Sequence, residues 1–182
     1  MKHPARTLDY ETLLILLDKE IVAGNVNLTW DGELALFTYS KSAVYDKAWS
    51  EATMLARGLV VDLVARRIVA TPFPKFFNIG EYGADCVPAE PFEVFDKLDG
   101  SLAIVFFHGG QWRAATKGSF TSDQALWAQA RIQEIVSQTP EALVPGTTYC
   151  CEAIYAANRI VIPYSPEHEG LWLLAAYDSD GR

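Results

Sequence analysis

Lys97-Leu98-Asp99-Gly100-Ser101 lies between two apolar runs of the sequence, residues 92–95 before it and residues 102–107 after it. Both runs are rich in aromatic and β-branched residues and show no helical period, so each is predicted to form a strand. The Asp-Gly pair is typical of a turn. We therefore expect Lys97 at a strand end, where the backbone turns and the long amine faces a cleft.

The lysine amine at this turn has two interpretations. An unperturbed lysine has a pKa of about 10.4, so ordinary solvation leaves the amine charged and inert as a nucleophile. Cationic neighbours, partial burial or metal-bound phosphate would favour the neutral, reactive form. The stretch is therefore either a turn that carries a solvated lysine or a site of covalent catalysis by a lysine amine.

The composition indicates one folded domain over residues 1–182. Hydrophobic residues make up 50% of the chain and charged residues 21%, which supports a buried core. The formal net charge of -8 argues against a broadly basic nucleic-acid surface. A polyanion would have to meet a local cluster of cations.

Neither a membrane segment nor an export signal is predicted. No apolar run approaches the ~20 residues that cross a bilayer, and the first residues do not lead into the apolar part of a signal peptide. The three cysteines, Cys86, Cys150 and Cys151, have no metal-type spacing. These observations predict a reduced, cytoplasmic protein without a membrane partner.

Hydrophobic periodicity and turn signals predict an α+β fold with mainly antiparallel sheets and flanking helices. Helices are expected at residues 10–23 and 122–137, with a short helix near the end of an irregular region at 41–55. The clearest hairpin turns at Asp31-Gly32. The expected strands lie near residues 26–30, 34–37, 59–64, 68–70, 92–95, 102–107, 111–115, 147–155, 159–163 and 171–177.

Five charged residues lie inside or against apolar runs, although charges are rarely buried without a partner. They are Arg57, Lys75, Lys97, Lys117 and Glu152. Taken singly, each is best explained as a solvated, turn or ion-paired residue. Their order along the chain is more informative, because Lys-x-Asp-Gly is followed by Lys-Gly-Ser, a helix and a strand glutamate.

Five stretches carry this order. They are Ala56-Arg57-Gly58-Leu59-Val60-Val61-Asp62, Pro74-Lys75-Phe76-Phe77-Asn78-Ile79-Gly80-Glu81, Lys97-Leu98-Asp99-Gly100-Ser101, Thr116-Lys117-Gly118-Ser119 and the stretch from Glu152 to Tyr164. Together they resemble the covalent nucleotidyltransferase superfamily, and within it the phage-type ATP-dependent RNA ligases that repair cut tRNA. The resemblance covers residues from about 34 to 177 and implies a nucleotidyltransferase core of the ATP-grasp-like ligase type.

The resemblance implies a role for each charged residue. Lys97 would attack the α-phosphate of ATP and carry AMP as a phosphoramidate; AMP then passes to a 5′-phosphate RNA end, and a 3′-hydroxyl seals the strand. Arg57, Lys75 and Lys117 would contact the nucleotide and neutralise its phosphates. Glu152 would contact the nucleotide sugar or a metal-bound water, and Asp99 would orient the water shell of Mg²⁺ or Mn²⁺.

Two further motifs of the family are expected after this point, a Glu-Gly pair and a Lys-x-Lys pair whose lysines grip the α-phosphate. No lysine follows Lys117. We therefore expect a domain that is incomplete at its C-terminus, truncated or naturally short, with a C-terminal domain and RNA, tRNA included, as partners. Two alternatives stay open: a degenerate module that binds nucleotides or RNA ends without ligation, and an unrelated α+β protein with surface lysines.

Overall fold

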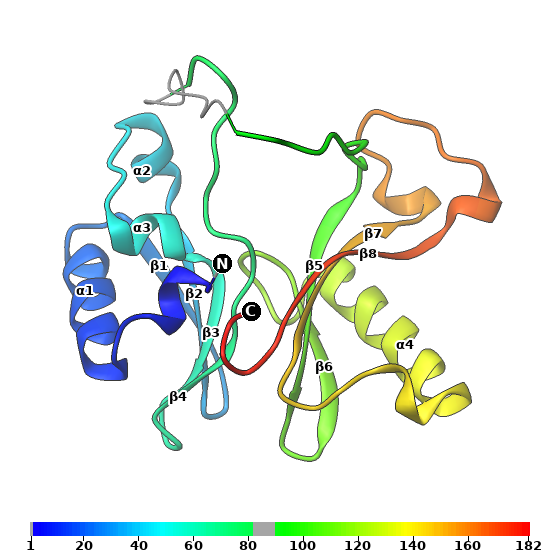
Figure 1. Ribbon diagram of the computed structural model, residues 1–182, viewed down its shortest axis with the longest axis horizontal. Coiled ribbons are helices and arrows are strands. Elements are labelled where there is room, and N and C mark those ends of the chain that lie inside the picture. Colours follow the sequence, from blue (N-terminus) through cyan, green and yellow to red (C-terminus); the bar gives the residue numbers. More distant parts are fainter. Residues whose placement is uncertain (1, 82–89) are drawn as a thin grey trace.

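Two antiparallel sheets lie side by side in the computed structural model, which describes residues 2–81 and 90–182 (Figure 1). The first sheet has the strand order β1-β2-β3-β4, and the second has the order β6-β5-β7-β8. This architecture confirms the predicted α+β fold. The strands are β1 (Val26–Asp31), β2 (Leu34–Tyr39), β3 (Arg57–Asp62), β4 (Arg67–Ala70), β5 (Ser101–His108), β6 (Gln111–Ala115), β7 (Thr148–Ile154) and β8 (Gly170–Tyr177).

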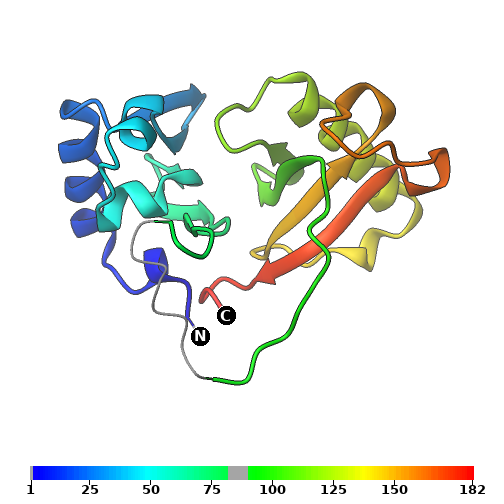
Figure 2. The same cartoon turned by 90° about the horizontal axis from the view of Figure 1, so that it is seen from above.

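Helices cover the outer face of each sheet (Figure 2). Asp9 caps the first helix by accepting a hydrogen bond from Thr12 N at 2.9 Å, and Ser122 caps the long helix beside the second sheet. Both predicted helices are confirmed, and no helix of the described residues is long and apolar enough to cross a membrane. The α-helices are α1 (Tyr10–Val22), α2 (Lys41–Tyr45), α3 (Glu51–Leu55) and α4 (Asp123–Gln138), and the 3₁₀ turns are Pro4–Arg6, Pro140–Ala142, Ala156–Asn158 and Pro166–His168.

Successive side chains of a strand point to opposite faces of its sheet, so the apolar side chains form three cores. The molecule thus has four layers, which are helices, the first sheet, the second sheet and α4. Leu36 of β2 and Phe106 of β5 are fully buried between the two sheets. Phe37 of β2 instead packs in a core with residues of α1 and α3, and Val105 of β5 packs with residues of α4. The central strands are thus apolar on both faces because both faces are covered.

Gly58 allows the two sheets to approach each other at the start of β3. Its φ is +97°, and a Cβ built on it would lie 2.4 Å from Ile104 Cδ1 and 3.1 Å from Lys117 Cα. Any other residue would therefore meet both backbone strain and a steric clash. The glycine sets Arg57 next to the second sheet.

The strand predicted at residues 92–95 is absent, so this prediction is wrong. Residues 90–99 contain neither helix nor strand. Phe92 and Val94 are 81% and 83% exposed, and the segment runs outside the two sheets without a strand beside it (Figure 2). An apolar run without a pairing partner cannot satisfy its backbone groups as a strand. Cys86 lies outside the described residues.

The strand predicted at residues 159–163 is also wrong, because its backbone donors bind a side chain instead. Val161 N and Ile162 N both donate to Asp99 Oδ2, at 2.7 and 2.8 Å. A carboxylate that captures backbone N–H groups competes with sheet pairing. The segment is therefore an ordered loop that contacts the turn before β5.

Candidate active site

Residues 97–100, named here the Lys97 turn, lie directly before β5 and are held by β7 and by the loop that follows it. Gly100 N donates a hydrogen bond to Glu152 Oε1 at 2.9 Å. Asp99 N donates to the hydroxyl of Tyr164, also at 2.9 Å. The backbone of the turn is therefore fixed from two directions.

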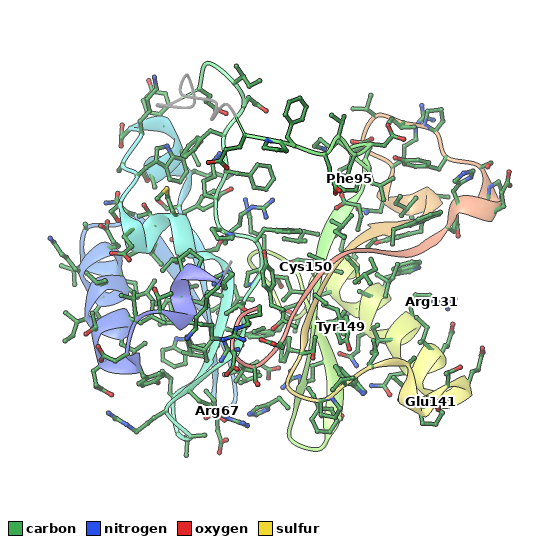
Figure 3. All side chains as sticks on the ribbon, viewed as in Figure 1. Arg67, Phe95, Arg131, Glu141, Tyr149 and Cys150 are labelled. Atoms are coloured by element: carbon green, nitrogen blue, oxygen red, sulfur yellow. The ribbon has the colours of Figure 1, made fainter. Side chains whose placement is uncertain are left out.

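A cavity of about 810 Å³, named here the Lys97 cavity, brings Lys97 together with Arg57 and Glu152. The side chains of Phe95 and Leu174 form part of its apolar wall. Figure 3 shows Phe95 at the upper end of β5, which is the end that adjoins the turn. The Lys97 side chain is exposed, and its Nζ has one weak contact, 3.5 Å from the carbonyl oxygen of the next residue. The amine is thus free to reach a ligand in this cavity.

Glu152 is the half-buried acid of the Lys97 cavity. Burial raises the pKa of its carboxyl group, while the hydrogen bond from Gly100 N and the charges of Lys97 and Arg57 act in the opposite direction. Additional cations in the cavity would therefore favour the ionised carboxylate. In that form Glu152 can accept hydrogen bonds from a sugar hydroxyl or from a metal-bound water.

Arg57 is held at the edge of the cavity by an aromatic ring. Its guanidinium lies 5.0 Å from the ring centroid of Phe76, which also lines the cavity and is 63% exposed. Arg57 Nη1 also donates a long hydrogen bond to Phe73 O at 3.5 Å, and the stacking leaves the other N–H groups of the guanidinium available to an anion. The Arg57 side chain is thus suited to bind a phosphate that enters the cavity.

Lys75 and Lys117 do not line the Lys97 cavity; both lie on a cluster of aromatic rings. Lys75 Nζ is 3.9 Å from the Phe77 centroid and 5.3 Å from that of Trp49, and Lys117 Nζ is 4.6 Å from the Tyr39 centroid. Trp49 packs edge-on against both of the other rings. The structure therefore divides the predicted cations into a pair at the cavity and a pair on this cluster.

Two groups of side chains could hold a metal ion. Asp99 Oδ2 is occupied by two backbone N–H groups, and these hydrogen bonds, from Ile162 and then Val161, lower the pKa of the carboxyl group. Asp99 Oδ1 makes no hydrogen bond within the described residues. The free oxygens of Asp99 and Glu152 are hard ligands suited to the water shell of Mg²⁺.

The second group lies elsewhere in the fold. One ligand atom each from Glu33, Asp62 and His108 falls within 4.8 Å of the others, and His108 Nε2 is 2.9 Å from Asp62 Oδ2. Burial alone would raise the pKa of Asp62, but hydrogen bonds from Ala65 N and His108 outweigh it and lower the pKa. The contact between His108 and Asp62 joins the end of β3 to the end of β5.

Sequence reasoning gave no role to Tyr164 or to the buried side chain of Asn158. Asn158 Nδ2 donates to Ala153 O at 2.8 Å, and its Oδ1 accepts from Ser101 Oγ at 3.0 Å. The signal was present, because Asn and Pro interrupt the apolar residues at 158–163 and so indicate an ordered loop rather than a strand. This loop supports the Lys97 turn.

The fold has a counterpart among solved structures. A solved structure described as a candidate ATP-dependent DNA ligase from Aquifex aeolicus matches 93% of this chain with a TM-score of 0.54 and 16% sequence identity. The match covers 44% of that chain. At this identity the likeness shows the fold alone, which is that of a ligase nucleotidyltransferase.

The family follows from the sequence. The family model described as RNA ligase matches residues 55–180, so this chain belongs to the RNA ligase family. The matched range contains Arg57, Lys97 and Glu152.

Two curated relatives support this membership. A candidate bifunctional polynucleotide kinase/RNA ligase of Autographa californica nuclear polyhedrosis virus is 27% identical over 148 residues, which are 68% of this chain and 21% of the relative. A candidate RNA ligase of Thermovibrio ammonificans is 29% identical over 117 residues, which are 61% of this chain and 31% of the relative. The chain therefore spans less than a third of either relative.

Proposed function

We propose that this chain performs the lysine-adenylylation step of an ATP-dependent RNA ligase, with Lys97 as the nucleophile. The neutral Nζ attacks the α-phosphorus of ATP and forms a P–N bond. The bond from that phosphorus to the bridging oxygen breaks, and pyrophosphate leaves. The proton released from the amine passes to solvent.

The observation that carries this proposal is the cavity that Lys97 shares with Arg57 and Glu152. Nucleotidyl transfer needs positioning and charge neutralisation more than other covalent chemistry from the protein. Arg57 supplies a rigid cationic fork at the rim, and Glu152 supplies an acceptor opposite it. The cavity therefore offers a nucleophile, an anion contact and a hydroxyl contact together.

Lys75 and Lys117 extend the phosphate contacts in this proposal. Lys75 directly precedes Phe76, which lines the Lys97 cavity. Lys117 lines a neighbouring cavity of about 420 Å³, and Leu102 belongs to the walls of both cavities. A lysine side chain is flexible, so in this proposal each amine leaves its aromatic ring to contact the phosphate tail of a bound nucleotide.

Asp99 and Glu152 would hold Mg²⁺ or Mn²⁺ through water, since both have carboxylate oxygens beside the turn and are close enough for the charge of Asp99 to act on Glu152. When bound, the ion supplies positive charge to the phosphates of ATP. Asp99 Oδ1 would face the water shell of the ion, while Oδ2 accepts the hydrogen bonds of Val161 N and Ile162 N.

RNA ends are the proposed substrates of the later steps. A 5′-phosphate oxygen attacks the phosphorus of the adenylylated lysine, the P–N bond breaks, and Lys97 regains a proton. A 3′-hydroxyl then attacks the phosphorus of the adenylylated 5′-phosphate, the phosphoanhydride bond breaks, AMP leaves, and the hydroxyl proton passes to solvent. Family membership supports RNA as the substrate class, and the 5′-phosphate and 3′-hydroxyl ends, with tRNA among the substrates, are part of the proposal.

The direct test is covalent labelling with α-labelled ATP and Mg²⁺. We expect a label on the wild-type chain and none on Lys97→Ala, whereas Lys19→Ala, an exposed lysine on α1, should label like the wild type. Reversible ATP binding without a label would overturn the enzyme and leave a degenerate nucleotide-binding module. No binding at all would overturn both functions.

A further inference from the structure

Asp99 is held by a single loop through both its backbone and its side chain. Its N–H donates to the Tyr164 hydroxyl at 2.9 Å, and its Oδ2 accepts from Val161 N and Ile162 N. The same residue lies two positions after Lys97. The loop at 161–164 therefore controls where the Lys97 turn lies.

This loop has its own anchors on the second sheet. Asn158 is 8% exposed and bonds to Ala153 O, Ser101 Oγ and Gln124 Nε2. The Tyr164 ring lies 6.1 Å from that of His168. The Tyr164 ring thus has the His168 ring as a neighbour while its hydroxyl reaches the turn.

The opposite side of the turn has one comparable support. Gly100 N donates to Glu152 Oε1, but Lys97 itself has no side-chain partner beyond a weak contact to the next carbonyl within the described residues. Residues 90–99 have no strand or helix to fix them. The position of the amine consequently depends on the few hydrogen bonds at Asp99 and Gly100.

We infer that Tyr164 is a positioning residue for the nucleophile: its hydroxyl accepts the Asp99 N–H and thereby sets the position of Lys97 in the cavity. This inference rests on the proposed adenylylation by Lys97. Tyr164 touches the turn rather than the reacting atoms. Loss of the hydroxyl leaves the ring contact with His168 intact but removes one anchor of the turn.

The test compares Tyr164→Phe with Tyr149→Phe in the full chain. Tyr149 is a matched control, because its hydroxyl also accepts a backbone N–H, that of Val144, at 2.9 Å, and it does not line the Lys97 cavity. Both variants lose one phenol-to-backbone hydrogen bond. The variants differ in the N–H group that loses its acceptor, which is that of Asp99 in the Lys97 turn for Tyr164→Phe and that of Val144 for Tyr149→Phe.

The expected result is a split between binding and chemistry. Tyr164→Phe should lower the single-turnover rate of adenylylation at saturating ATP by about tenfold, since small misplacements of reacting groups are costly. Its dissociation constant for a non-reactive α,β-methylene analogue of ATP should stay within about twofold. Tyr149→Phe should match the wild type in both measurements. An unchanged rate in Tyr164→Phe, or an equal loss in both variants, would overturn the inference.

Amide hydrogen exchange gives a second measurement that does not need catalysis. Exchange in the peptide that covers residues 97–100 should rise in Tyr164→Phe and not in Tyr149→Phe. If the wild type forms no adduct, the proposed function fails, and the exchange result still decides whether Tyr164 positions the turn. Unchanged exchange at 97–100 would show that it does not.

Discussion

Replacement of Gly100 by alanine should displace the Lys97 turn from β7. A Cβ built on Gly100 would lie 2.5 Å from Ala153 O and 3.2 Å from Glu152 Cγ, whereas ordinary contacts begin near 3.4 Å. The closest atom is a backbone oxygen within the β5–β7 ladder, where Ser101 pairs with Ala153, so the strand cannot easily give way. The turn must therefore move, by roughly 1 Å, the shift that relieves such an overlap.

This shift should affect both stability and chemistry. Overpacking of this kind costs about 1–3 kcal/mol of unfolding free energy. The movement also strains the hydrogen bond from Gly100 N to Glu152 Oε1 and carries Lys97 with it. A displacement of about 1 Å can lower a catalytic rate by a factor of about 100. We expect a loss of that order in the single-turnover rate of adenylylation.

Gly170→Ala is the matched control. Gly170 begins β8, has no atom within 4 Å of a built Cβ and needs no positive φ. It should change stability by less than about 1 kcal/mol and leave adenylylation unaltered. A Gly100→Ala chain that unfolds at the wild-type urea midpoint and is adenylylated at the wild-type rate would show that the added methyl group causes no clash.

Three further outcomes follow from burial and charge. Because burial raises the folded-state pKa of Glu152, protonation stabilises the folded chain below that pKa and the ionised form opposes folding at neutral pH. At pH 7, Glu152→Gln should therefore unfold at a urea concentration no lower than the wild type does. It should adenylylate Lys97 about 100-fold more slowly. A lower urea midpoint than that of the wild type would contradict the expectation for stability. Burial raises the pKa of Cys150 to about 11 and that of Cys151 to about 12, so peptide mass spectrometry should find neither alkylated by iodoacetamide at pH 8 unless urea is present. Phe106→Ala, between the sheets, should cost about 3–5 kcal/mol in urea unfolding, while the exposed Phe92→Ala should cost almost nothing.

The sequence predicted the parts of the fold in which the residues that form the pattern contact residues close to them in sequence. The hairpin of β1 and β2 pairs Asp31 with Leu34 around Gly32, whose φ is +59°, as the Asp-Gly signal indicates. The two long helices were predicted from their apolar period, and they begin at the side-chain caps Asp9 and Ser122. Each of these features depends on residues within a few positions of one another.

The errors arose where a distant group decides the conformation. Residues 159–163 have strand-like composition, but the carboxylate of Asp99, about sixty positions earlier, binds the N–H groups of Val161 and Ile162. Residues 92–95 are also rich in residues typical of strands, but no strand lies beside them. Propensity reports how well a residue fits a pleated surface and cannot report whether such a surface is present.

The candidate site was predicted in part. The motif order grouped five charged residues, and the structure places three of them, Arg57, Lys97 and Glu152, around one cavity. It did not indicate that Lys75 and Lys117 rest on aromatic rings, because Tyr39 and Trp49 come from separate parts of the chain. Their roles as nucleotide contacts stay predictions.

Peptide mass spectrometry of the chain after incubation with ATP and Mg²⁺ tests directly whether Lys97 is the nucleophile. We expect one added AMP, attached to Lys97 and removed by added pyrophosphate. An AMP on another lysine, or no adduct under conditions where ATP is bound, would contradict it.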